Sequence, residues 1–428
     1  MINPEKELQM DKAAEEDDGV LADPLLQFPF LVDKKSVDYI RENKIMLILR
    51  GLSGSGKSTI VRHIVRTYPE AVVCSPDDFF LDSNGVYKFD DGKIRPAHKH
   101  CQDKARQTCE KGEVATVVVD TSNVERWEIE YFSMANRHGY RLVLVEPKTP
   151  WRLDANVGEF GEVLTMYFGW FLNRNDSKNL VVLGKRWFSL CFESCAEFRE
   201  DFRQLKIYFN QHQRNSLVAN KEMLHCTAKF CGTMGYATKE EVVRSLGRVF
   251  DLSIVGFVIT KRTFGVRIKL GEEELELWDR DDNEESPDKL IKSGKREMGK
   301  MAAGKKVADF SEDAGAESLM SGNHLKEADL SDDDDVRRFR PLSIRGRRAH
   351  ITLGTYTGVK PVTTGLDALE VARAEEAGLE ATSFEIGKKG TVLRRYALGW
   401  WVIYPKERQV VQAIFTGHYE PAYKRFDD

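Results

Sequence analysis

The sequence lacks any long apolar run. Its longest runs, such as Ala115 to Val119, have the length of a strand and are far too short to cross a bilayer. The first residues, Met1 to Glu7, contain no apolar signal core and no glycine at position 2 for myristoylation. The last residues, Lys424 to Asp428, contain no prenylation cysteine. We therefore expect a cytoplasmic protein without a signal peptide, a transmembrane helix or a lipid anchor of its own.

The chain also lacks a strong charge of either sign. Its formal net charge is -4 over 428 residues, which excludes a globally basic nucleic-acid coat but leaves a local basic groove open. The length favours two or three domains. The seven cysteines are odd in number and scattered, as in proteins of a reducing compartment. A zinc site is disfavoured because the only candidate set has loose spacings: Cys191, Cys195, Cys226 and Cys231.

The first half of the chain has the pattern of a parallel α/β domain. Helix-length segments separate four apolar strands, predicted at 45–50, 71–74, 115–120 and 141–146. The first strand runs directly into Gly51 to Ser58, which matches G-x-x-x-x-G-K-[ST] in the required strand-loop-helix context. Such a loop cradles phosphates with backbone N–H groups, and its Lys and Ser reach the outer phosphates and magnesium. The predicted nucleotide-binding residues are Gly51, Ser53, Gly54, Ser55, Gly56, Lys57, Ser58 and Thr59.

Acidic residues follow the next two strands and would suit a kinase. Asp77 and Asp78 end the second strand, where a base for a hydroxyl nucleophile would lie. Asp120 ends the third strand near the expected metal, and Arg126 follows near the transferred phosphate. Each acid could equally cap a helix, so both interpretations stay open.

The second half of the chain changes character. The stretch from Pro150 to Asn220 is predicted to be mainly helical, and strands and hairpins follow from Met223. We expect two strands joined by a short turn at 252–260 and 265–270, and another such pair at 396–404 and 409–415. A helix is expected between the two pairs, at 364–377. Segments 1–24 and 272–340 are acidic, polar and poor in aromatics, so we expect both to be disordered and the second to be a dispensable insertion. The predicted domains are therefore 25–165, and 166–271 joined with 341–421.

Two His-x-Thr tripeptides lie in these later strands. They are His225-Cys226-Thr227 and His350-Ile351-Thr352. Side chains at positions i and i+2 of a strand share a face, so each motif offers an imidazole beside a hydroxyl. Two such strands at one site could break a phosphodiester without metal. One His would activate water, the other would protonate the leaving oxygen, and the hydroxyls would hold phosphate oxygens. The sequence does not decide which His is the base.

With both sets of motifs, the chain resembles the vertebrate 2′,3′-cyclic-nucleotide 3′-phosphodiesterase family of myelin and its fish homologues associated with nerve regeneration. The stretches that carry the resemblance are Leu26 to Leu31, the phosphate loop, Val145 to Thr149, Tyr167 to Leu172, both His-x-Thr strands and Ala413 to Gly417. The stretches at 151–167 and 211–221 depart from the family pattern. The resemblance implies an α/β domain similar to polynucleotide kinases, followed by an α+β domain of the two-histidine (2H) phosphoesterase superfamily.

The same resemblance implies an activity and its residues. The reaction would open nucleoside 2′,3′-cyclic phosphates, or such ends of RNA, to 2′-phosphates. The implied catalytic residues are His225, Thr227, His350 and Thr352, and the implied substrate-binding residues are Tyr167, Phe230 and Arg348. The cytoskeleton, and the inner membrane surface for forms with a lipidated C-terminus, are the other partners that it suggests. No cofactor is expected for this reaction, whereas ATP and magnesium are the ligands expected at the phosphate loop.

Two other functions stay open from the sequence alone. One is a polynucleotide 5′-hydroxyl kinase that uses the phosphate loop. The other is a catalytically weak scaffold that binds RNA or the cytoskeleton.

Overall fold

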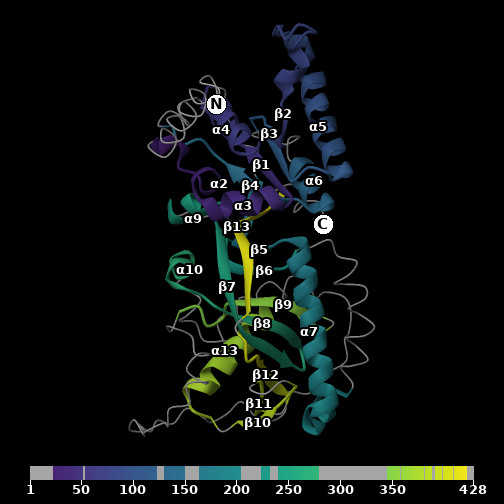
Figure 1. The fold of residues 1–428 in the computed structure, drawn as a ribbon, viewed down its shortest axis with the longest axis vertical. Coiled ribbons are helices and arrows are strands. Elements are labelled where there is room, and N and C mark those ends of the chain that lie inside the picture. Colours follow the sequence, from purple (N-terminus) through teal and green to yellow (C-terminus); the bar gives the residue numbers. More distant parts are fainter. Residues whose placement is uncertain are drawn as a thin grey trace, which may run out of the picture.

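The structure is a computed structural model of the whole chain. It describes residues 23–51, 54–122, 130–149, 163–203, 223–231, 240–278, 345–356, 358–379, 381–387, 391–397, 399–407 and 409–421. The elements form two stacked domains along the longest axis of the molecule (Figure 1). None of the described helices has the length and apolar character that a membrane span requires.

The N-terminal domain is built on a parallel sheet of four strands in the order β2-β3-β1-β4. The strands are β1 (Ile45–Leu49), β2 (Val72–Cys74), β3 (Thr116–Asp120) and β4 (Arg141–Val145). All five residues of β1 are buried, as expected for a central strand covered on both faces. This sheet confirms the four predicted strands and their parallel arrangement.

Helices pack around this sheet (Figure 1). They are η1 (Pro24–Leu26), α2 (Pro29–Val32), α3 (Lys34–Glu42), α4 (Lys57–Thr67), η2 (Pro76–Phe80), η3 (Asp91–Lys93), α5 (Ile94–Lys111) and α6 (Glu130–His138). Local sequence signals set their ends. The carboxylate of Asp33 accepts the backbone N–H of Ser36 and so caps α3, while α5 stops at Gly112, whose φ of 65° suits glycine.

The C-terminal domain is built on a sheet of nine strands in the order β10-β11-β12-β7-β13-β5-β6-β9-β8, with a further pairing between β7 and β8. The strands are β5 (Val163–Leu172), β6 (His225–Phe230), β7 (Val249–Thr260), β8 (Thr263–Lys269), β9 (His350–Thr355), β10 (Thr382–Glu385), β11 (Val392–Ala397), β12 (Trp400–Tyr404) and β13 (Gln409–Pro421). The helices are α7 (Arg174–Ser194), α9 (Glu240–Ser245), α10 (Glu272–Leu277) and α13 (Val362–Glu376).

Four sequence predictions for this domain were wrong in part. Strand β5 lies inside the stretch predicted to be mainly helical, and it begins three residues before the predicted start of the C-terminal domain at residue 166. The predicted strand 396–404 is the end of β11, a turn and β12. β12 and β13 do not form a hairpin, because each pairs with β7. Helix α10 falls inside the insertion that was predicted to be disordered. It is ordered because Leu277 and Trp278 are buried in the core.

Other predictions are confirmed or concern residues outside the description. The β7–β8 hairpin and helix α13 are confirmed. The predicted disorder of 1–22 and 279–340 lies outside the described residues, as does segment 211–221. All seven cysteines are free and buried, so none forms a disulfide.

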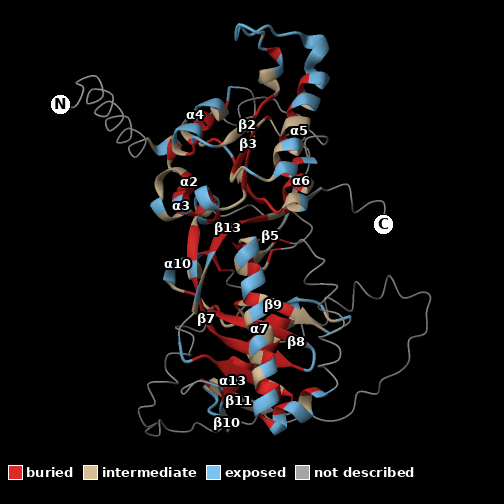
Figure 2. Cartoon of the chain, turned by 45° about the vertical axis from the view of Figure 1, so that its right-hand side comes forward, coloured by how far each residue is buried: buried red, intermediate tan, exposed pale blue. Residues whose placement is uncertain are grey.

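The two domains share core residues. Phe171, Val249 and Ile414 of the C-terminal sheet belong to the same apolar cluster as the strands of the N-terminal sheet. Strand β13, still paired with β5, reaches the N-terminal domain, where Tyr419 packs edge-on against Phe132 of α6 with ring centroids 5.7 Å apart. The hydroxyl of Thr416 donates to the Leu142 carbonyl of β4 at 2.7 Å. Figure 2 shows buried residues running through this junction.

Candidate active site

The two His-x-Thr motifs lie on neighbouring antiparallel strands, β6 and β9, and Cys226 pairs with Ile351. Both of these middle residues are fully buried and point into the core. Continuing the register by one residue in each direction places His225 across from Thr352 and Thr227 across from His350. Because side chains alternate along a strand, the two imidazoles and two hydroxyls share the face opposite to the core. The structure therefore brings the four predicted catalytic residues together.

The His350 ring is positioned by a backbone carbonyl two residues earlier and by helix α13. Its Nδ1 lies 2.6 Å from the Arg348 carbonyl. A carbonyl can only accept, so Nδ1 carries the proton of the neutral ring and Nε2 is left for chemistry. A Cβ atom on Gly365 of α13 would lie 2.7 Å from Cε1 of His350, so only glycine permits this approach. The Thr352 hydroxyl donates to Thr364 Oγ1 at 3.0 Å, next to Gly365.

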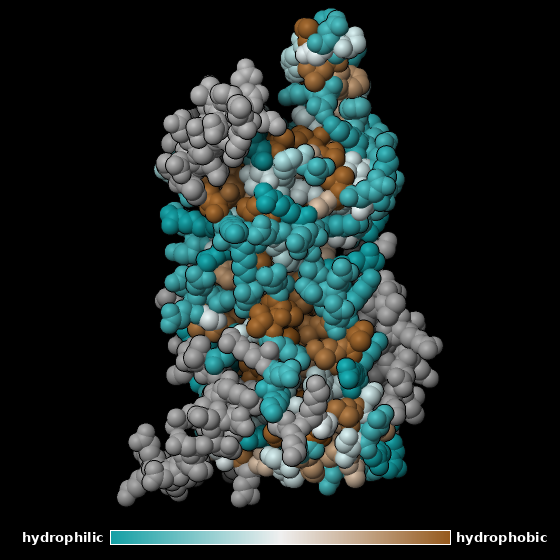
Figure 3. Space-filling view, in the orientation of Figure 1, coloured by the Kyte–Doolittle hydropathy of each residue, from teal (hydrophilic) through white to brown (hydrophobic). Residues whose placement is uncertain are grey.

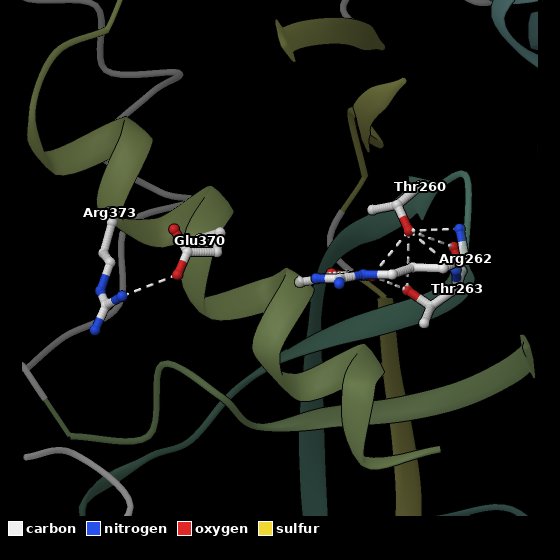
Figure 4. Close-up of polar contacts among 6 residues, drawn as sticks. Thr260, Arg262, Thr263, Glu370 and Arg373 are labelled. Atoms are coloured by element: carbon white, nitrogen blue, oxygen red, sulfur yellow. Dashed lines mark hydrogen bonds and ion pairs between the residues drawn. The ribbon is translucent and has the colours of Figure 1, made fainter. Parts of the chain in front are cut away.

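Helix α13 is fixed in this position by a buried carboxylate. Asp367 has no exposed surface and accepts from the hydroxyls of Thr260 and Thr263 and from the Arg262 guanidinium. Figure 4 shows these donors at the β7–β8 turn beside the helix. Each lone pair of the buried carboxylate therefore has a partner, which is the condition for burying a charge at acceptable cost. This clamp lies two residues from Gly365 and so sets the distance between α13 and His350.

His225 is packed among aromatic rings. The Tyr167 ring stacks on His225 with centroids 4.9 Å apart and on His418 at the same separation. Phe171 covers another side of His225 at 5.0 Å, and the Arg141 guanidinium of the N-terminal domain lies 4.3 Å from the centre of the Phe171 ring. Gly169, between the two β5 aromatics, allows close contact with β6, because a Cβ there would lie 2.5 Å from the Cys226 carbonyl oxygen.

Both imidazoles are biased towards the neutral form. Burial lowers the pKa of His225 to about 3, assisted by the positive charges of Arg141, His418 and His350, and opposed by a backbone hydrogen bond with Met223. Burial also lowers the pKa of His350, and a backbone hydrogen bond with Arg348 opposes the shift. Neutral imidazoles at neutral pH are able to accept a proton from water.

The three predicted substrate-binding residues have different surroundings. The Tyr167 ring stacks with the imidazoles of His225 and His418, and its role in substrate binding stays a prediction. The main chain of Arg348 positions His350, and its side chain is half-buried near the site. Phe230 pairs with Tyr167 through the backbone, and its side chain lies outside the description. The sequence analysis missed Phe171, His418, Thr364 and Gly365. The alternation of β5 and β13 could have indicated Phe171 and His418, whereas nothing local indicated Gly365.

The phosphate loop adopts the predicted arrangement. Gly56 caps α4 with a φ of 102°, and Lys57 Nζ donates to the Gly51 carbonyl at 2.8 Å. The Ser55 hydroxyl is buried and has no hydrogen-bond partner among the described residues, as expected for a group that a phosphate would satisfy. Thr149 donates to the Ser55 carbonyl at 2.8 Å. Gly54 lies in this loop and Ser58 and Thr59 lie in the first turn of α4, while Ser53 lies outside the described residues.

The predicted acids gather near this loop. Burial raises the pKa of Asp120 to about 6, with Lys57 acting in the opposite direction and Asp77 and Asp78 adding to the rise. Asp78 forms an ion pair with Lys104 at 2.7 Å. Arg126 lies outside the described residues. Within the described residues, no group of three His, Cys, Asp or Glu side chains is arranged to hold a metal ion.

Comparison with known proteins assigns the two domains. Residues 164–312 and 311–425 match the family described as 2′,3′-cyclic nucleotide 3′-phosphodiesterase, and residues 46–155 match a family described as an AAA domain. The chain is 30% identical over 437 residues to the 2′,3′-cyclic-nucleotide 3′-phosphodiesterase of Rattus norvegicus, covering 94% of this chain and 89% of that protein. The Pongo abelii protein of that name is 29% identical over 434 residues, with the same coverage.

A further similarity covers a smaller part of the chain. NEDD4-binding protein 2 of Homo sapiens is 34% identical over 122 residues, which are 28% of this chain and 7% of that protein. The family match to the C-terminal domain, by contrast, contains both His-x-Thr strands and spans more than half of the chain. The chain belongs to the 2′,3′-cyclic nucleotide 3′-phosphodiesterase family.

Proposed function

We propose that this protein hydrolyses nucleoside 2′,3′-cyclic phosphates, or the same group at RNA ends, to 2′-phosphates, with His225 and His350 as the proton-transfer pair. The observation that carries this is the β6–β9 register, which sets each imidazole across from the hydroxyl of the other motif. Cyclic nucleotides are the substrates named for the family.

The proposed mechanism needs two proton transfers. One imidazole takes a proton from water as the water oxygen attacks phosphorus. The bond from phosphorus to O3′ breaks, and the other imidazole, as imidazolium, gives O3′ its proton. The hydroxyls of Thr227 and Thr352 donate hydrogen bonds to phosphate oxygens as charge builds up on them. The bound phosphodiester carries a negative charge, which favours the protonated acid that the empty site disfavours.

The test is the product formed from 2′,3′-cyclic NADP in the presence of EDTA. The expected result is the 2′-phosphate at an unchanged rate, because neither proton transfer needs a metal. Loss of turnover in EDTA, with recovery on adding zinc or magnesium, would contradict the mechanism.

A second function is supported by the phosphate loop. We propose that ATP with magnesium binds at Gly51 to Thr59 and that the γ-phosphate passes to a hydroxyl activated by Asp77. The buried, unsatisfied Ser55 hydroxyl and the Asp120 carboxyl at the end of β3 support this proposal. Magnesium, when bound, would neutralise the charge of the phosphates, and Ser58 and Asp120 would hold it. The experiment is transfer of labelled γ-phosphate from ATP to 5′-hydroxyl RNA, which should disappear in Lys57→Ala.

A further inference from the structure

A projecting arm carries most of the exposed aromatic surface of the N-terminal domain. The arm consists of residues 79–94, between β2 and α5, and stands out at the top of the molecule (Figure 1). Of the 13 large apolar side chains exposed among the described residues, six lie in these 16 residues: Phe79, Leu81, Val86, Tyr87, Phe89 and Ile94. Figure 3 shows apolar atoms at its tip beside polar ones. A concentration of this kind on a protruding segment marks an interaction surface.

The rings on the arm are ordered relative to one another. Tyr87 and Phe89 are nearly parallel, with an interplanar angle of 14° and centroids 6.5 Å apart. Both rest on the buried ring of Phe80, at 5.9 and 5.1 Å. Each of the two rings keeps about half of its surface exposed, at 50% for Tyr87 and 56% for Phe89. The two rings are therefore supported by Phe80 and keep about half of their surface open to solvent.

The base of the arm touches the candidate phosphoryl-transfer centre. The Tyr87 hydroxyl donates to Oδ1 of Asp77 at 3.2 Å. The arm is also closed by pairing of Leu81 with Tyr87. A chain that stacks on Tyr87 would thus place its end beside the carboxylate proposed to activate a hydroxyl.

Cationic side chains accompany the rings. Lys88 lies between Tyr87 and Phe89 in the sequence, is 70% exposed, and pairs with Asp82 at 2.8 Å. Arg95 is exposed at the start of α5 and makes no ion pair within the described part of the chain. An exposed ion pair contributes little, so Lys88 can exchange Asp82 for a phosphate at small cost. Alternating aromatic and basic residues are the chemistry that holds single-stranded nucleic acid.

We propose that the arm binds a single-stranded nucleic acid, whose bases stack on Tyr87 and Phe89 and whose phosphates meet Lys88 and Arg95. The proposal deepens the phosphoryl-transfer function by assigning the surface that holds its RNA acceptor, and it rests on that function only for the position of the 5′ end. A membrane is the less favoured occupant, because two nearly parallel rings supported by Phe80 suit stacked bases. The acids Asp82, Asp90 and Asp91 disfavour either anionic partner, so the test includes both.

The test separates the contribution of the aromatic rings to RNA affinity from that of exposed apolar surface, and it uses the whole chain. The probe is a 12-nucleotide single-stranded RNA with a 5′-hydroxyl and a 3′ fluorophore. The double variant Tyr87→Leu/Phe89→Leu keeps apolar area but loses both rings, and its affinity for RNA should fall roughly tenfold or more. Tyr87→Phe keeps the ring and should bind as the wild type does. Val182→Ala/Val410→Ala, at exposed sites of the other domain, is the matched control and should also bind normally.

Turnover of 2′,3′-cyclic AMP by each variant verifies that the protein is folded. Unchanged RNA affinity of the double leucine variant would overturn the proposal. The proposal would also be overturned if the double leucine variant lost binding to phosphatidylserine vesicles but kept its affinity for RNA, since that result assigns the arm to a membrane. A further outcome is that the wild type transfers no phosphate while the double leucine variant still loses RNA binding. That result would support the arm as an RNA-binding site and reject only the kinase function. Phosphate transfer that is unaffected by the variant would reject the arm as the acceptor site.

Discussion

Gly365 and His350 touch in a way that only glycine allows: a Cβ atom on Gly365 would lie 2.7 Å from Cε1 and 2.8 Å from Nδ1 of the imidazole. Gly365→Ala should push the ring away from its hydrogen bond with the Arg348 carbonyl. A misplacement on the order of 1 Å costs roughly 10²-fold in rate. We expect that loss in kcat on 2′,3′-cyclic AMP, measured beside Thr363→Ala in the same helix. Near-normal kcat in the glycine variant would show that α13 does not position His350.

The two histidines should behave as one acid–base unit. His225→Ala and His350→Ala should each lower kcat by at least ~10²–10⁴-fold, and the double variant should lose little more. A substrate whose leaving group needs no proton, such as a 4-nitrophenyl phosphodiester, should restore activity to one single variant but not to the other. Rescue of both variants, or of neither, would contradict the division into one base and one acid.

The buried His225 makes stability depend on pH. Its pKa is lowered to about 3, chiefly by burial, from an ordinary value of 6.5. Between these values the unfolded chain binds a proton that the folded chain does not, so the free energy of unfolding should fall as the pH falls from about 6.5 to about 3. His225→Gln should reduce this slope in urea titrations, whereas His100→Gln, at an exposed position, should leave it unchanged. Equal slopes in the wild type and His225→Gln would refute the assignment.

Two acidic residues of α13 provide a matched comparison of stability. Asp367 is buried and satisfies three donor side chains, whereas Glu370 pairs with Arg373 at the surface at 2.9 Å (Figure 4). Asp367→Ala should cost on the order of 3 kcal/mol, because it leaves two hydroxyls and a guanidinium without their acceptor. Glu370→Ala should cost about 0–1 kcal/mol. Urea denaturation distinguishes the two, and similar values would mean that the clamp contributes no more than a surface pair.

Catalysis at the histidines should be independent of the phosphate loop. Lys57→Ala removes the ammonium group that reaches the outer phosphates and should abolish ATP binding, measured by calorimetry. Turnover of 2′,3′-cyclic AMP should stay within about twofold, because Lys57 and the His-x-Thr strands lie in different domains. A parallel loss of both activities would show that the domains act as one catalytic unit.

Part of this architecture could be predicted from local patterns. Buried parallel strands are continuous apolar runs, so Ile45–Leu49 and its neighbours were recognised, and the phosphate loop follows from its own residues. The grouping of each His with its Thr follows from the period of a strand. The pairing of β6 with β9 could not be predicted, because it is a contact between residues more than a hundred positions apart.

Other features depend on tertiary context in the same way. The aromatic and β-branched residues of strand β5 favour a strand locally, but its place in the sheet comes from pairing with β6 and β13. The approach of Gly365 to His350 depends on where Asp367 fixes α13. The acidic first turn of α10 resembles the insertion that follows it, so the sequence did not indicate a helix there. The helix is ordered because Leu277 and Trp278 are buried.

The position of Tyr419 has a consequence for biosynthesis. This residue lies near the C-terminal end of the chain, yet its ring packs against Phe132 within the core of the N-terminal domain. A ribosome that has completed the phosphate-loop domain has not yet supplied this part of its core. We therefore expect this face of the first domain to stay exposed to solvent until β13 has been translated.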